Sequence, residues 1–151
     1  MEVTPNPAME RFAFLVGVWD TVGKHPLLPD KALHGEVSFD WFEGGAFLVM
    51  RSRFNEPGIP TGIAIFGSDD ALGEYHMLYF DERGVSRRYD VTIDTNSWRW
   101  LRNAPDFSQR YVVTVAPDRR SMEGRGELSR DGTTWEQDLG VTYRLRTARE
   151  D

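Results

Sequence analysis

The sequence predicts an all-β fold: a closed antiparallel up-and-down barrel of about ten strands, of the calycin or lipocalin-like kind, with a short N-terminal helix. Three observations predict it. Turn residues recur roughly every ten positions, the segments between them are rich in Val, Ile, Thr and aromatic residues, and apolar side chains alternate along those segments. A meander of this length leaves two exposed sheet edges unless it closes, so a barrel is expected, with a two-sheet sandwich as the alternative.

Nine turn signals divide residues 1–151, which we interpret as a single domain, into ten segments. In chain order the signals are Pro29-Asp30, Glu43-Gly44-Gly45, Glu56-Pro57-Gly58, Ser68-Asp69-Asp70, Asp81-Glu82-Arg83-Gly84, Thr95-Asn96, Ala104-Pro105-Asp106, Pro117-Asp118 and Arg130-Asp131-Gly132. Gly, Pro, Asn and Asp dominate them, and each of these residues favours a turn for its own physical reason. Regular spacing of this kind is typical of hairpins joined by short loops.

The one helix that the sequence predicts covers residues 7–13. Asn6 can cap it, and Pro7 can occupy the first helical position, where a missing N–H costs nothing. The apolar residues that share one face at helical spacing are Met9, Phe12, Ala13 and Val16. This face is expected to cover one end of the barrel.

Turn lengths predict which side chains share a face. A four-residue turn at 81–84 places Val85 opposite Phe80, and so puts His76 on the same face as Arg87 and Tyr89. A two-residue turn at Thr95-Asn96 then aligns Ile93 with Trp98 and Val91 with Trp100 on that face. In the C-terminal hairpin, the same face is expected to carry Met122, Gly124, Gly126, Leu128, Trp135, Gln137, Leu139, Val141, Tyr143 and Leu145.

Composition narrows the function classes. The net charge is −6 and no basic run occurs, which argues against nucleic acid and against an anionic membrane surface as partners. The chain has no cysteine, and its first residues contain no apolar stretch typical of a signal peptide, so a cytoplasmic location is expected. No run approaches the roughly 18 apolar residues of a transmembrane helix.

Two short motifs resemble those of the calycin superfamily. Gly17-Val18-Trp19 opens the first strand, and Tyr143-Arg144-Leu145-Arg146 lies in the last one. The resemblance implies that a basic residue, Arg144 or Arg146, packs against Trp19, although strand parity counted from Trp135 points both arginines away from the interior. Over nearly its whole length the chain more specifically resembles the bacterial DUF1579-type, nitrobindin-like group, in Gly17-Val18-Trp19-Asp20, Glu43-Gly44-Gly45-Ala46-Phe47-Leu48-Val49, Tyr79-Phe80-Asp81, Gly84-Val85, Asp131-Gly132 and Trp135-Glu136.

The nitrobindin resemblance implies a haem held by a histidine on a late strand. The corresponding stretch, 135–145, contains no histidine, and Tyr143 is left open as a substitute ligand. No haem or other cofactor is therefore expected. The three scattered histidines and the absence of cysteine also give no metal-ligand spacing, so no metal site is expected.

The inward face of the middle strands predicts a small-molecule site. The candidate ligand-binding residues are His76, Arg87, Tyr89, Trp98, Trp100, Arg102, Gln109 and Tyr111, with Gln137 and Tyr143 opposite. Buried arginines need a partner, so a hydrophobic or amphipathic organic acid with its head near Arg87 or Arg102 and its body against Trp98 and Trp100 is one interpretation. In the other, acidic residues such as Glu36 or Glu127 pair with the arginines and the aromatic side chains fill the lumen.

Three function classes stay open. A carrier or sensor of a small molecule rests on the barrel and its aromatic interior. An enzyme acting on a hydrophobic acid would use His76 and Tyr89, the candidate catalytic pair, because histidine titrates near neutrality and tyrosine can relay a proton. A protein-interaction module, such as a homodimer with a filled barrel, would use apolar residues expected on the outer face: Phe47, Val49, Tyr75 and Tyr79.

Overall fold

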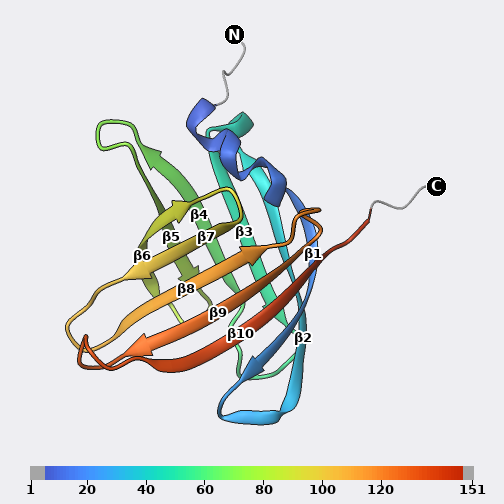
Figure 1. Cartoon of the computed structure of the whole chain (residues 1–151), viewed down its shortest axis with the longest axis vertical. Coiled ribbons are helices and arrows are strands. Elements are labelled where there is room, and N and C mark those ends of the chain that lie inside the picture. The colour runs from blue at the N-terminus through green and yellow to red at the C-terminus, as the bar shows by residue number, and fades with distance from the viewer. Residues whose placement is uncertain (1–5, 148–151) are drawn as a thin grey trace.

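The computed structural model describes residues 6–147 and is almost entirely β (Figure 1). In chain order its elements are the 3₁₀ helix η1 (Pro7–Leu15), β1 (Gly17–His25), β2 (Leu28–Phe42), the short 3₁₀ turn η2 (Glu43–Gly45), β3 (Phe47–Phe54), β4 (Gly62–Asp69), β5 (Glu74–Asp81), β6 (Ser86–Ile93), β7 (Ser97–Arg102), β8 (Ser108–Val115), β9 (Ser121–Ser129) and β10 (Glu136–Leu145). No helix within this range has the length and apolar character needed to cross a membrane.

The ten strands described close into one barrel, in which every strand pairs antiparallel with its neighbours in the chain. Closure is made by β1 and β10, which pair from Trp19 opposite Leu145 to Lys24 opposite Gly140. This pairing between the first and last strands removes both sheet edges, so the predicted barrel is confirmed and the sandwich alternative is wrong.

The first hairpin turns earlier than predicted. β1 ends at His25 and β2 begins at Leu28, so Pro29 and Asp30 lie inside β2 and not in a turn. The ring nitrogen Nδ1 of His25 accepts a hydrogen bond from the Leu27 backbone N–H at 3.1 Å, which stabilises the tight connection. Proline is tolerated near a strand end. The prediction took Pro29-Asp30 for a turn, whereas both residues lie at the start of β2.

The N-terminal helix begins as predicted and runs further. The Asn6 side chain accepts a hydrogen bond from the Ala8 N–H at 3.1 Å, and Pro7 is the first helical residue. The helix is of the 3₁₀ type and ends at Leu15, so its buried residues are Met9, Phe12 and Leu15. It covers the upper end of the barrel in Figure 1, which is the end where β3 begins and β4 ends.

Beneath η1 the lumen is filled by aromatic side chains. Phe12 packs on Phe66 at 5.8 Å between ring centroids, and the Phe39 and Phe66 rings both meet the edge of Trp98, at 6.3 and 6.0 Å. Trp19 is fully buried, and its indole N–H donates to the Leu15 carbonyl at 2.8 Å, which ties β1 to the helix. These contacts form the hydrophobic core, in the half of the barrel next to η1.

The register of β6 and β7 is the predicted one, but that of β5 and β6 is not. Ile93 faces Trp98 and Val91 faces Trp100. In the preceding hairpin, however, Phe80 pairs with Ser86, because the loop has only three residues, 82–84. Gly84 adopts φ 82°, as expected for the residue that closes a three-residue hairpin loop. Relative to the prediction this slips β5 by one residue and reverses its two faces.

The C-terminal hairpin has the predicted faces from Val141 onward, with a different pairing. Val141 lies opposite Gly124 and Tyr143 opposite Met122, all on the buried face. A bulge between Gln137 and Gly140 shifts the register. The side chain of Gln137 is exposed, so its predicted place in the interior is wrong.

Candidate ligand-binding site

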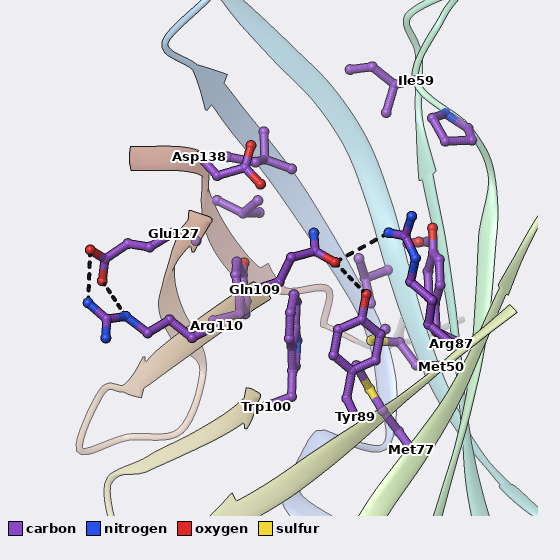
Figure 2. A pocket seen from close by; sticks show the side chains of 18 of the residues that line it. Met50, Ile59, Met77, Arg87, Tyr89, Trp100, Gln109, Arg110, Glu127 and Asp138 are labelled. Carbon is purple, nitrogen blue, oxygen red and sulfur yellow. Dashed lines mark hydrogen bonds and ion pairs between the residues drawn. The ribbon is translucent and has the colours of Figure 1, made fainter. Parts of the chain in front are cut away.

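The half of the barrel away from η1 contains a cavity of about 250 Å³. Its deep end reaches Trp98 of the aromatic core, and its mouth is bordered by Ile59 and Pro60 of the β3–β4 loop and by Arg83 of the β5–β6 loop. Figure 2 shows the side chains that converge on it from strands around the barrel. The lumen is therefore filled at one end and hollow at the other, so neither a fully open nor a fully filled barrel describes it.

One wall of the cavity is a continuous row of aromatic rings, which we call the aromatic wall: Tyr79, Tyr89, Trp100 and Tyr111, on β5 to β8. Tyr79 and Tyr89 lie 6.2 Å apart between centroids, and Tyr89 and Trp100 lie 4.6 Å apart. Trp100 and Tyr111 are stacked at 5.1 Å with an angle of 13° between their planes. The rings are tilted against one another along most of the row, so the wall offers a ligand a mixture of aromatic faces and edges.

A polar cluster stands near the mouth, at the outer end of the aromatic wall. Gln109 Oε1 accepts two hydrogen bonds, from the Tyr89 hydroxyl at 2.8 Å and from Arg87 Nη1 at 3.3 Å (Figure 2). Burial raises the pKa of Tyr89, while the nearby Arg87 guanidinium acts in the opposite direction. Tyr89 is therefore a neutral phenol that donates to Gln109, and Arg87 brings a positive charge into the cavity.

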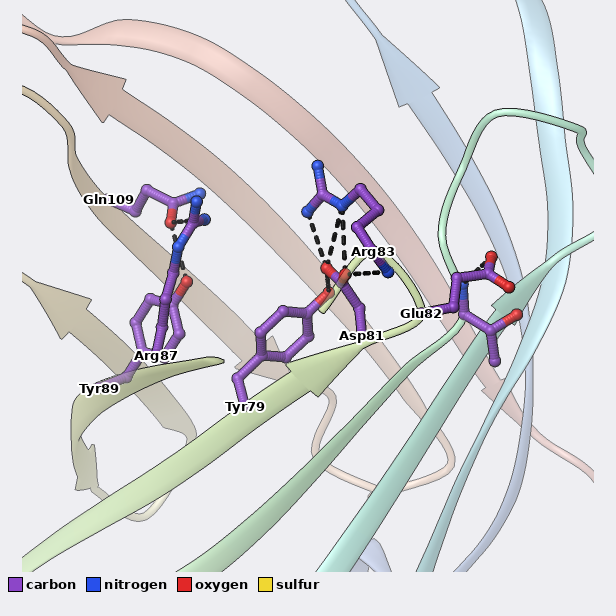
Figure 3. Close-up of polar contacts among 8 residues, drawn as sticks. Tyr79, Asp81, Glu82, Arg83, Arg87, Tyr89 and Gln109 are labelled. Atoms are coloured by element: carbon purple, nitrogen blue, oxygen red, sulfur yellow. Dashed lines mark hydrogen bonds and ion pairs between the residues drawn. The ribbon is translucent and has the colours of Figure 1, made fainter. Parts of the chain in front are cut away.

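The other charges near the mouth are paired. Arg83 binds Asp81 with Nη2 at 2.7 Å from Oδ2, and the Tyr79 hydroxyl donates to the same oxygen at 2.9 Å (Figure 3). The Arg83 guanidinium, with help from the Tyr79 hydroxyl, holds the pKa of Asp81 well below its usual range. Arg110 makes two contacts with the Glu127 carboxylate, at 3.1 and 3.2 Å.

Arg87 differs from the other arginines that line the cavity. Among residues 6–147, no carboxylate lies within 4.0 Å of its guanidinium, which instead lies 5.6 Å from the centroid of the Phe107 ring. Glu36 pairs with Arg53 and Arg146, and Glu127 with Arg110. The alternative that Glu36 or Glu127 neutralises the inward arginines is therefore wrong for Arg87.

At the Tyr111 end of the aromatic wall, two tyrosine hydroxyls meet. Tyr111 Oη and Tyr143 Oη are 2.5 Å apart, and each residue is only 7% exposed. Burial raises the pKa of Tyr143 to about 12, and burial together with the neighbouring Tyr143 raises that of Tyr111. Both are therefore neutral phenols. We refer to Tyr79, Tyr89, Tyr111 and Tyr143 as the four cavity tyrosines.

Six of the eight predicted ligand-binding residues line the cavity: Arg87, Tyr89, Trp98, Trp100, Gln109 and Tyr111. Tyr143, predicted opposite them, lines it as well. Arg102 does not; its Nη1 donates to the Phe107 carbonyl at 3.1 Å, in the β7–β8 loop. The structure thus brings most of the predicted set together, without showing what they bind.

His76 is not in the cavity, and its predicted inward position is wrong. It pairs with Asp90 on β6, while Met77 pairs with Tyr89, so His76 and Tyr89 project to opposite faces of the barrel. The cause is the three-residue loop that reverses β5. The candidate catalytic pair of His76 and Tyr89 therefore does not exist in this fold.

The reversal of β5 also turns toward the interior residues that were predicted on the outer face of the barrel. Tyr79 and Met77 line the cavity, and the Tyr75 hydroxyl donates to the Ala8 carbonyl of η1 at 2.7 Å. Tyr75 and Tyr79 are thus not outer-face residues for a homodimer, whereas Phe47 lies on the outer side and is 41% exposed. Gly84 was the available signal, since a glycine at the end of a short loop favours the three-residue form.

The last-strand arginines do not pack on Trp19. Arg146 Nη2 binds Asp20 at 2.5 Å and Glu36 at 3.1 Å, across β1 and β2 on the outer surface. Trp19 lies inside, where Leu145 is its cross-strand partner. The arginine therefore reinforces barrel closure through carboxylates beside the tryptophan.

Within the described residues, the cavity lining contains no histidine that could hold a haem. Of the three histidines, all within the described range, none lines the cavity. Tyr143, the remaining candidate ligand, is a neutral phenol whose oxygen is engaged with Tyr111.

Comparison with known proteins supports the fold. No family model matches the chain, and no curated protein matches it. Among solved structures the chain is similar to the crystal structure of Rv2717c from M. tuberculosis, at 14% sequence identity and a TM-score of 0.64, over 95% of this chain and 100% of that one. At this identity the similarity shows a shared overall fold and nothing finer.

Proposed function

We propose that the protein binds a small amphipathic organic acid in the open half of its barrel, with the acid group at Arg87 and the apolar body against the aromatic wall. The observation that supports the proposal is that Arg87 has no carboxylate partner among residues 6–147. It is a cavity-lining guanidinium whose one hydrogen bond within residues 6–147 is a long contact to an amide oxygen, at 3.3 Å. A positive charge in a partly apolar enclosure costs free energy unless an anion accompanies it.

The neighbours of Arg87 suit a carboxylate. Gln109 accepts through Oε1, which leaves its amide N–H groups free to donate to a ligand beside the guanidinium. Arginine binds carboxylates through two parallel N–H donors, which fixes orientation as well as charge. The acid group would therefore lie near the mouth, where it can keep part of its hydration.

The size and lining of the cavity limit the ligand. A cavity of about 150 Å³ lined by apolar side chains is known to accommodate benzene. The 250 Å³ found here accommodates one substituted ring or a short branched chain. Most of the lining is apolar, with a few polar groups at fixed places, as in small-molecule sites generally.

Fluorescence titration tests the proposal, since Trp98 and Trp100 both line the cavity. The probe is 4-isopropylbenzoate, and its uncharged amide is the matched ligand control. We expect the acid to bind more tightly than the amide in the wild-type protein, and Arg87→Met to weaken acid binding by roughly 10- to 100-fold, the worth of a charge-assisted hydrogen bond.

Arg88 supplies the matched control variant. It is the next residue along β6, exposed on the outer face of the barrel, so Arg88→Met makes the same change in net charge outside the cavity. Arg88→Met should leave the dissociation constant unchanged. Equal affinity for acid and amide, or equal effects of the two arginine variants, would contradict the proposal.

A further inference from the structure

The hydrogen bond between Tyr111 and Tyr143 leaves one of their two hydroxyl hydrogens without an acceptor. Two neutral phenols carry two O–H groups, and a contact between their oxygens uses one of them. Within residues 6–147 neither hydroxyl has another hydrogen-bond partner. Thr21, the cross-strand neighbour of Tyr143, does not serve as the acceptor, because its Oγ1 makes no hydrogen bond either.

A second donor without a partner lies beside the cavity. The indole Nε1 of Trp98 is buried and has no acceptor in the described part of the chain, and the residue is 2% exposed. The Trp98 ring lines the cavity, but its Nε1 has no surface exposed there. The spare hydrogen of the tyrosine pair is therefore the donor considered for a ligand in the inner part of the site.

The two polar parts of the cavity are separated by the length of one ring. Along β8, Tyr111 follows Gln109 by two residues on the same face, which corresponds to about 7 Å between their backbone positions. The stacked rings of Trp100 and Tyr111 line the cavity beside this interval. A planar ligand ring packed against them would hold one substituent at Arg87 and the opposite substituent near the tyrosine hydroxyls.

From these positions we infer that the ligand is a single-ring aromatic acid that carries a hydrogen-bond-accepting oxygen, such as a carbonyl, on the side opposite its carboxylate. This inference rests on the proposed function and adds to it the class of ligand. A purely hydrocarbon inner end would leave the spare phenol O–H unpaired, whereas a carbonyl oxygen accepts from it.

A matched pair of ligands isolates the inner oxygen. The acetyl group of 4-acetylbenzoate and the isopropyl group of 4-isopropylbenzoate have nearly the same shape, and only the first accepts a hydrogen bond. Water favours burial of the isopropyl group, so a preference for acetyl has to come from the site. We expect the wild-type protein to bind the acetyl acid more tightly by roughly 2- to 12-fold, the net value of one hydrogen bond.

Two sets of variants assign that preference. In the double variant Tyr111→Phe/Tyr143→Phe the preference should vanish or reverse, while in Tyr75→Phe, which removes a hydroxyl outside the cavity, it should remain. The double variant is needed because either hydroxyl alone could still donate to the ligand. Unfolding curves show whether the double variant is folded, and if it is not, Tyr111→Phe/Tyr143→Leu takes its place and should likewise abolish the preference.

The outcomes separate the two proposals. If the acids bind through Arg87 but the isopropyl acid binds equally or better, the inference about the inner oxygen is wrong and the proposed function stands. If the preference for acetyl survives the loss of both hydroxyls, the inference is also wrong. If neither acid binds, the proposed function fails and the inference fails with it.

Discussion

The hydrogen bond between Tyr111 and Tyr143 allows a direct test of the structure through stability. Each hydroxyl is buried, and each is the other's only partner in the described chain. Tyr143→Phe removes the bond and leaves the Tyr111 hydroxyl unpaired. A lost hydrogen bond with an orphaned buried partner costs about 1 to 3 kcal/mol. For a chain of this size, that lowers the melting temperature by roughly 2 to 4 °C for each kcal/mol.

The double variant Tyr111→Phe/Tyr143→Phe should cost less than the two single variants together. Once both hydroxyls are gone, no polar group is left without a partner, and two apolar ring edges can pack. We expect a coupling free energy of about 1 kcal/mol or more from a double-mutant cycle, with each free energy of unfolding taken from urea denaturation. The Tyr75→Phe variant, combined with Tyr143→Phe, provides an uncoupled reference.

Additivity would refute the reasoning. Distant, independent substitutions add to within about 0.3 to 0.5 kcal/mol. If Tyr111→Phe and Tyr143→Phe add to this tolerance, the two hydroxyls do not depend on each other, and the short contact described above does not exist in solution.

Three further outcomes are expected. Gly124→Ala should destabilise by about 1 to 3 kcal/mol because its Cβ would overlap the Tyr111 hydroxyl, whereas Gly140→Ala, with no atom closer than 3.7 Å, should not; urea denaturation compares them. Phe12→Ala should cost about 3 to 5 kcal/mol by emptying the core under η1, and a cost below 1 kcal/mol, about that of an exposed site, would argue against this packing. Burial raises the pKa of the four cavity tyrosines, so the folded state keeps protons that the unfolded state releases above about pH 10. Stability should therefore be full below that pH and fall by up to roughly 1.4 kcal/mol per pH unit for each tyrosine above it; unfolding free energies that stay flat from pH 9 to 11 would contradict the burial.

Sequence patterns predicted the barrel and most of its interior because turn chemistry and alternation agree over most of the chain. At Thr95-Asn96 a two-residue turn was predicted. The pairs that it implies, Ile93 with Trp98 and Val91 with Trp100, are those observed. Side-chain alternation then predicts the inward-facing residues of β6 to β8, and most of the predicted cavity residues lie on these strands.

The buried face of β5 was predicted wrongly because both faces of this strand are apolar. Tyr75, Met77 and Tyr79 alternate with His76, Leu78 and Phe80, so alternation does not say which set is buried. The loop had to decide, and a one-residue difference in its length reverses every side chain of the strand. The two readings differ only in whether Asp81 belongs to the strand, which depends on the conformation of Gly84.

The bulge in β10 was hidden for a related reason. Between Gln137 and Gly140, β10 has one residue more than β9, and this bulge brings Asp138 and Leu139 to the cavity. Bulges depend on local twist and on how the barrel closes, neither of which leaves a repeating pattern in the chain. Gly140 is compatible with a bulge but does not specify one.

The division of the lumen into a packed half and a hollow half has a consequence for how this protein can change. Substitutions at Arg87, Gln109 or the β5–β6 loop would change the proposed ligand site without touching the contacts among Phe12, Phe66 and Trp98 that hold the helix to the strands. The ligand selectivity of the proposed site would therefore change with little loss of stability, because the aromatic core that stabilises the barrel lies in its opposite half.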